Sequence, residues 1–386
     1  MDRRKFFKVV GIGGAAMAAS SFTPNTVNAM NAVLPADIPA TNIKDALAYP
    51  RNAHSMPGKY RGKVVKITNP RAVDDNQVPV DSVAYDMLAE SMLLLTGEKK
   101  LKKAWLQFVG PKDRIGIKVN PIGGTLLSTS HAVTKAIIRQ LQEAGIPLEN
   151  LVIWDRRQED METSGFTKEN YPDVRLAATE TMENGSFYGQ DGELLGASNI
   201  DKRWYYFADV EEKYDAYTIP YMINEGKYSY FSKICTQQVD KIINVPIMKN
   251  AGTAVTICLK NLAFGSVTNT SRLHQYHWHS ACAQVCAFPP LRDKVVLNIA
   301  DGLIGCYDGG PAANPQFICR YNTLLVGSDP VAVDRIGHKM VIGRRVAEGR
   351  QKEDTPKGIT QLEMAQKYGL GVADMDAIEL IERNYE

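Results

Sequence analysis

The sequence has 386 residues, of which 44% are hydrophobic and 23% are charged. This composition is typical of a soluble globular protein with a sizeable hydrophobic core. The formal net charge is only +2, so neither a nucleic acid nor an anionic membrane surface is indicated as a partner.

The first segment of the chain has the features of an export signal. It begins Met1-Asp-Arg-Arg-Lys-Phe-Phe-Lys8, and residues 9–19 carry no charge. An apolar run of this length suits a signal peptide and is shorter than the roughly 20 residues that span a bilayer. Val27-Asn28-Ala29 offers a small-residue cleavage pattern. We therefore expect residues 1–29 to be a twin-arginine signal peptide, read by the twin-arginine translocation machinery.

Removal of this peptide would leave a folded protein in the periplasm with no stable membrane span. The sequence contains six cysteines, and none of them forms a Cys-x-x-Cys pair. A ferredoxin-type iron–sulfur motif or a structural zinc motif is therefore not indicated. Because a twin-arginine substrate folds before it is exported, we expect most of the cysteines to be buried free thiols.

The rest of the chain predicts alternating strands and helices. Residues 30–62 contain several Pro and Asn residues and predict an extended lead-in. Apolar residues then recur with strand-like or helix-like spacing. The second helix has cap candidates before it and a glycine after it, and with its flanking strands it indicates a βαβ unit. In chain order the predicted elements are a strand at 63–67, a helix at 81–95, a strand at 114–119, a helix at 130–144 and a strand at 151–154.

Three further apolar runs, at 241–245, 294–299 and 322–326, have the near-continuous hydrophobic character of buried parallel strands. We therefore predict a single α/β domain over residues 63–386, with a mainly parallel sheet and helices on both faces. An aromatic segment at about 184–230 interrupts this series. Two interpretations of it stay open: a β-rich excursion with aromatic cross-strand pairs, or an aromatic wall over a ligand pocket.

Lysine and asparagine residues stand where several of the predicted parallel strands end. Ligands of open α/β sheets bind beyond the carboxyl ends of the strands, where loop amides and helix N-termini favour anions. We expect the lysines to converge in one cleft with an aspartate, because a buried ammonium without a partner is costly. The candidate residues from these loops are Lys118, Asn120, Thr125, Lys249, Asn250, Lys260 and Asn261.

Aspartates supply the acidic groups of the predicted site. Asp301 follows a predicted strand, and Asp334 lies among apolar residues in a predicted helix, so either could pair with a lysine. Asp329 precedes a proline, which is typical of a helix N-cap, and it is also a candidate substrate-binding residue. Together with Lys118 and Lys260, Asp301 and Asp334 are the candidate catalytic groups, since lysine can act as a base or form an imine when its pKa is lowered.

Six segments stand out when they are taken in order: Ile117-Lys-Val-Asn-Pro121, Ile243-Asn-Val-Pro-Ile-Met-Lys249, Thr256-Ile-Cys-Leu-Lys-Asn-Leu262, Ala300-Asp-Gly302, Gly309-Gly-Pro311 and Val326-Gly-Ser-Asp-Pro-Val-Ala-Val-Asp334. They resemble domain-of-unknown-function family 362, and the resemblance runs from about residue 64 to residue 382. It implies a single α/β domain with a shared Lys/Asn/Asp site, and it supplies no reaction. Some relatives carry an added ferredoxin-like module, whose cysteine spacing this chain lacks.

A histidine cluster offers a second kind of site. If residues 274–286 form one helix, His274, His277 and Cys282 come near one face through steps of three and four residues, and His279 lies close by. Imidazole and thiolate suit a transition metal. The alternative is that these histidines are simply the polar edge of a helix.

The preferred interpretation is an exported enzyme that acts on a small anionic substrate, such as a carboxylate, a phosphate or a sulfate. Two alternatives stay open. One is a periplasmic metal-binding or redox accessory protein that uses the histidine cluster, and the other is a non-enzymatic anion-binding protein. The sequence names neither the reaction nor a cofactor.

Overall fold

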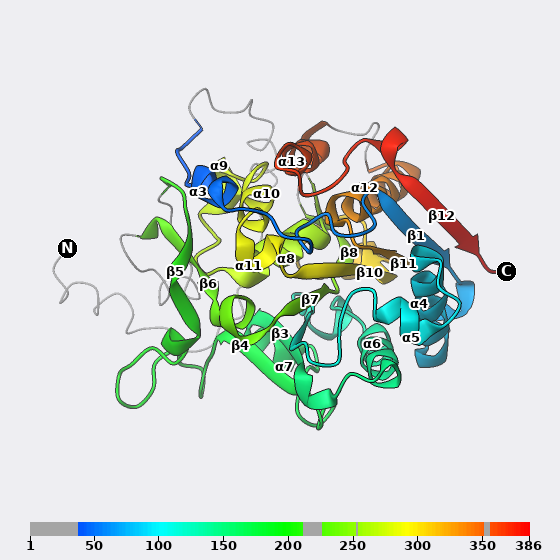
Figure 1. The fold of residues 1–386 in the computed structure, drawn as a ribbon, viewed down its shortest axis with the longest axis horizontal. Coiled ribbons are helices and arrows are strands. Elements are labelled where there is room, and N and C mark those ends of the chain that lie inside the picture. The colour runs from blue at the N-terminus through cyan, green and yellow to red at the C-terminus, as the bar shows by residue number, and fades with distance from the viewer. Residues whose placement is uncertain (1–37, 211–225, 252–253, 351–355) are drawn as a thin grey trace. The chain divides into compact units, whose positions relative to one another are not determined.

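The computed structural model describes residues 38–210, 226–251, 254–350 and 356–386. The signal peptide predicted at 1–29 lies outside the described residues, as do parts of the predicted lead-in and of the aromatic segment. Pro39–Glu386 forms one compact unit, and Figure 1 labels most of its elements.

A ten-stranded, mainly parallel sheet runs through this unit (Figure 1). Its main path has the order β12-β1-β11-β10-β7-β2-β3-β4, and β8 and β9 extend the sheet beside β10. Neighbouring strands from β10 to β4 all pair in parallel. The predicted α/β fold class is therefore confirmed. The strands are β1 Lys63–Thr68, β2 Ile115–Lys118, β3 Leu151–Arg157, β4 Arg175–Glu180, β7 Lys241–Asn244, β8 Ile247–Ala251, β9 Ala254–Thr256, β10 Val295–Cys306, β11 Ile318–Gly327 and β12 Glu379–Asn384.

The strand predicted at 322–326 runs against the others. β11 pairs antiparallel with both β1 and β10. It follows β10 through residues 307–317, which contain a single 3₁₀ turn and no crossover helix. A parallel connection needs a crossover of a dozen or more residues, usually with a helix, whereas a short loop joins antiparallel neighbours. The expectation of a parallel strand at this position was wrong for that reason.

Helices cover both faces of the sheet, with α4, α5 and α6 on one face and α8, α12 and α13 on the other (Figure 1). The predicted caps of α6 are present: the side chain of Ser130 accepts the N–H of Val133, and Gly145 ends the helix at a left-handed φ of 96°. The helices are α3 Ile43–Ala48, α4 Asp81–Thr96, α5 Leu101–Trp105, α6 His131–Ala144, α7 Gln158–Thr163, α8 Cys258–Ser266, α9 Leu273–Tyr276, α10 Ala281–Cys286, α11 Pro289–Arg292, α12 Pro330–Ala347 and α13 Pro356–Lys367.

The described part of the predicted lead-in is not wholly extended, because it contains the short helix α3. The buried guanidinium of Arg292 donates to the backbone carbonyls of Ala46, Tyr49 and Pro50 at 2.8–3.3 Å. Carbonyls at the end of a helix have no partner within the helix. A cation at that position therefore holds α3 against the domain.

The aromatic segment forms a separate two-stranded antiparallel sheet of β5 Ile200–Phe207 and β6 Tyr228–Ser232. The ring centroid of Tyr205 lies 5.1 Å from that of Tyr228 and 6.1 Å from that of Tyr230. Aromatic pairs of this kind stabilise adjacent strands. The predicted β-rich excursion is confirmed.

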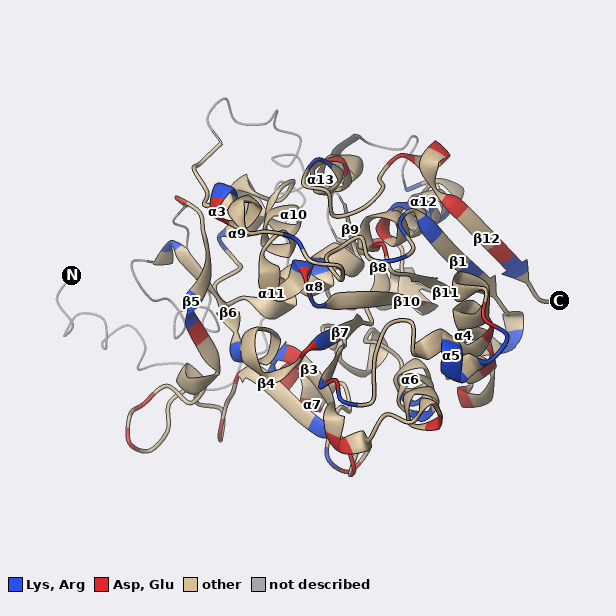
Figure 2. Cartoon of the chain, viewed as in Figure 1, with Lys and Arg blue, Asp and Glu red and all other residues tan. Residues whose placement is uncertain are grey.

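Oppositely charged residues pair along the edge strand β12 of the sheet. In Figure 2, β12 carries both basic residues in blue and acidic residues in red, whereas β10 is tan, without charged residues, over most of its length. Lys66 of β1 pairs with Glu382 of β12 at 2.8 Å, and Lys63 lies 3.6 Å from Glu379. Charges on an edge strand discourage pairing with other chains. None of the described helices is long and apolar enough to cross a membrane.

Candidate functional site

The sheet changes direction between β2 and β7. From β2 the chain continues to β3 and β4 on one side, whereas β7 and then β10 lie on the other side of β2. Lys118 at the end of β2 is the register partner of Asn244 at the end of β7. Ligands of open α/β sheets bind beyond the carboxyl ends of the strands at such a switch point. This edge of the sheet is therefore where the fold favours a site.

Lys118 is fully buried at the switch point. Its ammonium forms a short ion pair with Asp155 and also donates to the Val119 carbonyl at 2.8 Å and to Asn261 Oδ1 at 3.1 Å. The ring of Trp154 has its centroid 5.5 Å away. Burial lowers the pKa of Lys118, and the carboxylate of Asp155 opposes this effect. The charge of Lys118 is thus balanced within the protein.

Two asparagines connect Lys118 to Lys249. Asn261 Oδ1 accepts from both Lys118 Nζ and Asn120 Nδ2, each at 3.1 Å. Asn120 Oδ1 in turn accepts from Lys249 Nζ at 3.0 Å, and the Ile122 carbonyl accepts from the same ammonium at 2.6 Å. Residues from β2, its following loop, β8 and α8 therefore form one continuous buried network.

Lys249 differs from Lys118 because no carboxylate lies within ion-pair distance of it among the described residues. Burial, and then the positive charge of Lys260, lower the pKa of Lys249 to about 7. Lys260 is half-buried, and its ammonium lies 5.6 Å from the ring centroid of Phe264. Burial also lowers the pKa of Lys260. The ammonium groups of Lys249 in β8 and Lys260 in α8 thus repel one another near the carboxyl ends of the parallel strands.

The predicted aspartates have other partners. Asp301 lies inside β10, not at its end, and accepts the backbone N–H groups of Ser130 and Leu303 at 2.7 and 3.0 Å. Asp329 is the N-cap of α12 and accepts four backbone N–H groups at 2.9–3.1 Å. Burial raises the pKa of Asp329 to about 6, although these amides oppose the shift.

Asp334 lies in α12 and accepts the backbone N–H groups of Cys258 and Leu259 at 2.5 and 2.9 Å. These amides begin α8, where the helix dipole favours a negative charge. Burial raises the pKa of Asp334 to about 7 against the effect of these bonds. The expected lysine pairing of Asp301 or Asp334 was wrong, because backbone N–H groups occupy these carboxylates: those of Ser130 and Leu303 for Asp301, and those that begin α8 for Asp334.

The histidine cluster is not one helix. α9 ends at Tyr276 and α10 begins at Ala281, so His274 and Cys282 do not share a helical face. His277 and His279 are buried between the two helices, whereas His274 is exposed and its ring packs edge-on against Phe264. Among the described residues, no three His, Cys, Asp or Glu side chains form a group that could hold a metal ion.

All six cysteines are free thiols, and five of them are buried. Cys306 is the register partner of Lys249, across the pairing of β10 with β8. Of the other predicted substrate-binding residues, Asn250 is buried and Thr125 is exposed.

Part of the Lys/Asn network lies in a segment that matches a known protein family. Residues 206–339 match the family model of a domain of unknown function, DUF362. This segment contains Lys249, Lys260 and Asn261, whereas Lys118 and Asn120 precede it. The match supports the resemblance over that part of the chain and supplies no reaction.

A crystal structure of a protein from Thermotoga maritima, a target of the Northeast Structural Genomics Consortium, aligns with this chain at a TM-score of 0.38 and 11% identity. The alignment covers 69% of this chain and 59% of that protein. The search of curated proteins found no match.

A charged group that the sequence analysis missed lies outside the DUF362 segment. Asp155, Arg156 and Arg157 are the last three residues of β3, and Asp155 and Arg156 are buried. Glu180 at the end of β4 lies 3.7 Å from Arg156 and 3.1 Å from Arg157, and burial raises its pKa. The signal was available in the sequence, because these three charged residues directly follow the apolar run at 151–154 that predicted the strand, and so they lie toward its carboxyl end.

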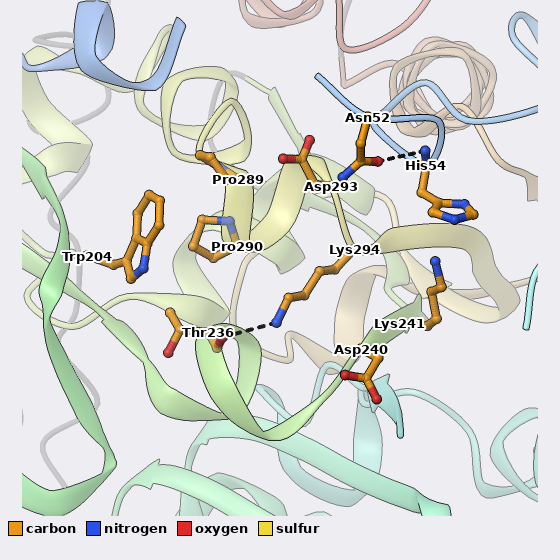
Figure 3. Close-up of a pocket in the computed structure, with 10 residues that line it drawn as sticks. All are labelled: Asn52, His54, Trp204, Thr236, Asp240, Lys241, Pro289, Pro290, Asp293 and Lys294. Carbon is orange, nitrogen blue, oxygen red and sulfur yellow. Dashed lines mark hydrogen bonds between the residues drawn. The ribbon is translucent and has the colours of Figure 1, made fainter. Parts of the chain in front are cut away.

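A pocket of about 370 Å³ lies at the opposite end of the strands (Figure 3). Its wall includes Lys241 at the start of β7 and Lys294 just before β10. Lys294 donates to three backbone carbonyls, those of Cys235, Thr236 and Val239, at 2.7–3.1 Å. Because parallel strands present their amino ends at one edge, this pocket is separate from the network around Lys249.

Proposed function

We propose that this protein is an enzyme that acts on a small anionic substrate at the switch point between β2 and β7. The observation that carries the proposal is the pair Lys249 and Lys260, which come from different elements and have no carboxylate partner among the described residues. A buried positive charge with a second positive charge near it is costly unless an opposite charge joins them. A carboxylate, phosphate or sulfate group would supply that charge.

Each residue of the network has a role in this proposal. Lys118 is held by Asp155 and positions Asn261 and, through it, Asn120. Asn120 orients the ammonium of Lys249. With a pKa of about 7, Lys249 can take up or release a proton at neutral pH, which is the range in which a general acid or base works best. Lys260 provides a second positive charge for the substrate.

The test measures thermal stabilisation by a panel of small carboxylates, phosphates and sulfates, followed by an assay for turnover of any ligand that binds. We expect Lys249→Met and Lys260→Met each to remove the stabilisation. Lys112→Met is the matched control, because Lys112 is exposed and precedes the amino end of β2. Affinity should fall as the pH rises above 7, because the neutral amine of Lys249 attracts an anion less strongly.

Two outcomes would contradict the proposal. If no anion in the panel stabilises the protein, or if both lysine variants respond as the wild type does, the switch point is not an anion site. Binding without turnover of any ligand would favour the non-enzymatic anion-binding protein that the sequence also allows.

We also propose that the protein is exported to the periplasm by the twin-arginine route. The support is the sequence of the N-terminal segment alone: the arginine pair Arg3-Arg4, the short uncharged run that follows it and the cleavage pattern at Val27-Asn28-Ala29.

A further inference from the structure

The loop after β2, residues 121–127, lies over Lys249. Within it, the carbonyl of Ile122 accepts the shorter of the two hydrogen bonds from Lys249 Nζ, at 2.6 Å. Lys249 itself is fully buried. Because Asn120 Oδ1 and this carbonyl accept two of the three N–H groups of the buried ammonium, a substrate oxygen reaches Lys249 only after a covering segment has moved, and this loop carries one of the two acceptors.

The two ends of the loop are anchored more firmly than its middle, which is the 3₁₀ turn Gly124–Leu126 and lies against α7. At one end the backbone N–H of Thr129 donates to the Asn120 carbonyl at 2.9 Å. At the other end Leu127 packs against Ile247 and Cys306. Among the described residues, the bond from Lys249 is the only hydrogen bond that joins residues 122–126 to another part of the protein. Such a segment opens locally at low free energy.

Two of the three exposed side chains of the loop are apolar, and the third is that of Thr125. Ile122 is 36% exposed and Leu126 is 57% exposed, and the carbonyl of Ile122 accepts from the buried ammonium of Lys249. Exposed hydrophobic side chains next to a polar site provide a surface for the apolar part of a ligand. The loop therefore combines two features that a ligand could use: the ammonium of Lys249, which it covers, and its own exposed apolar side chains.

The path of the loop requires a glycine at position 123. Gly123 adopts a φ of 120°, and a Cβ at this position would lie 2.5 Å from the carbonyl oxygen of Leu127. A side chain there would force the loop away from its present path. Gly185 provides a comparison, because it also has a positive φ of 76° but has no atom within 4 Å of such a Cβ.

We infer that the substrate is an anion with an apolar chain or ring, that its anionic oxygen displaces the Ile122 carbonyl from Lys249, and that its apolar part packs on Ile122 and Leu126. This inference rests on the proposed function, since it requires an anion at Lys249. It adds the class of substrate and assigns two specificity-determining residues outside the charged network.

The first experiment compares two carboxylates of equal charge, acetate and hexanoate, by isothermal titration calorimetry. Each buried methylene strengthens binding about fourfold, so hexanoate should bind the wild type at least about tenfold more tightly than acetate even if only part of its chain is covered. In Leu126→Ser this preference should fall severalfold. Leu106→Ser is the matched control, because Leu106 is 40% exposed and follows α5.

The outcomes separate this inference from the proposed function. Equal affinity for the two carboxylates, with both lost in Lys249→Met, would overturn the inference and leave the anion site intact. An unchanged preference for hexanoate in Leu126→Ser would also overturn it. If neither carboxylate binds in a manner that depends on Lys249, the inference and the proposed anion site both fail.

A second experiment tests displacement of the loop without any substrate. Acetic anhydride acetylates accessible amines, and mass spectrometry of the peptide that contains Lys249 gives the rate. We expect Gly123→Ala to raise this rate severalfold, Gly185→Ala to leave it unchanged, and hexanoate to slow it in the wild type. Circular dichroism establishes that both variants are folded. A folded Gly123→Ala protein with the wild-type acetylation rate would refute displacement.

Discussion

Lys118 and Lys249 have the same side chain at the same edge of the sheet, but their surroundings give them opposite energetic roles. Lys118 has a buried carboxylate beside it, and Lys249 has only neutral oxygens. Removal of one member of a buried ion pair leaves the other charge uncompensated. Removal of an ammonium that has no ionic partner leaves no such charge.

We therefore predict that Lys118→Met lowers the free energy of unfolding by about 3–5 kcal/mol. The double variant Lys118→Met/Asp155→Asn should recover part of this loss, because the stranded carboxylate is then neutral. Lys249→Met should change stability much less than Lys118→Met does. Urea titrations of the three variants test this, and equal stability of Lys118→Met and the wild type would show that the ion pair contributes nothing.

At the scale of single elements, α8 is the helix that brings the site together. Its amino end is capped from α12 by Asp334, and its third residue and fourth residue are Lys260 and Asn261. Near its carboxyl end, Gly265 allows the helix to approach the ion pair, since a Cβ there would lie 2.3 Å from both Cε and Nζ of Lys118. The close approach of α8 to Lys118 thus requires a glycine at position 265.

Gly265→Ala should destabilise the protein by about 1–3 kcal/mol, because overpacking displaces either α8 or Lys118. The intrinsic helix propensity of alanine acts in the opposite direction by about 1 kcal/mol. Gly343→Ala in α12 isolates that effect, because a Cβ there has no atom within 4 Å, and it should be neutral or stabilising. The prediction fails if thermal or urea unfolding gives both variants the same change in stability.

At the scale of the whole molecule, the positions of the elements could be read from the sequence more reliably than their partners. The apolar runs and the caps at Ser130 and Gly145 are local signals, and they placed β2, α6 and β3 to within a few residues. The direction of β11 depended on the length and content of one loop. The partner of Lys118 depended on the pairing of β2 with β3, in which Lys118 is the register partner of Trp154, one residue before Asp155.

In the candidate site, too, the sequence predicted which residues take part better than it predicted their contacts. The lysines and asparagines of the network were predicted because each follows a strand within the sequence. The contact of Asp334 with the start of α8 was missed, because it requires two helices separated by about 75 residues to pack together. Periodicity carries no information on such contacts, which tertiary packing alone decides.

Export is a prediction about the entire chain. Substitution of Arg3 and Arg4 together by lysine keeps the charge of the N-terminal segment and removes the arginine pair that the translocation machinery reads. We expect this variant to remain in the cytoplasm, with the wild-type protein in the periplasm, as measured by cell fractionation and immunoblotting. Periplasmic accumulation of the variant at the wild-type level would contradict twin-arginine export.

The pairing of β1 with β12 has a consequence for the order of events during synthesis. Lys66 and Glu382, which pair across these two strands, are 316 positions apart in the chain. At about 5–20 residues per second, a ribosome needs on the order of 15 to 60 seconds to make the intervening residues. Because β11 (Ile318–Gly327) is also made late, β1 lacks both of its neighbours in the sheet for most of this interval. The first strand of the sheet thus pairs with the last one. A nascent chain cannot finish this fold before the ribosome has made β12.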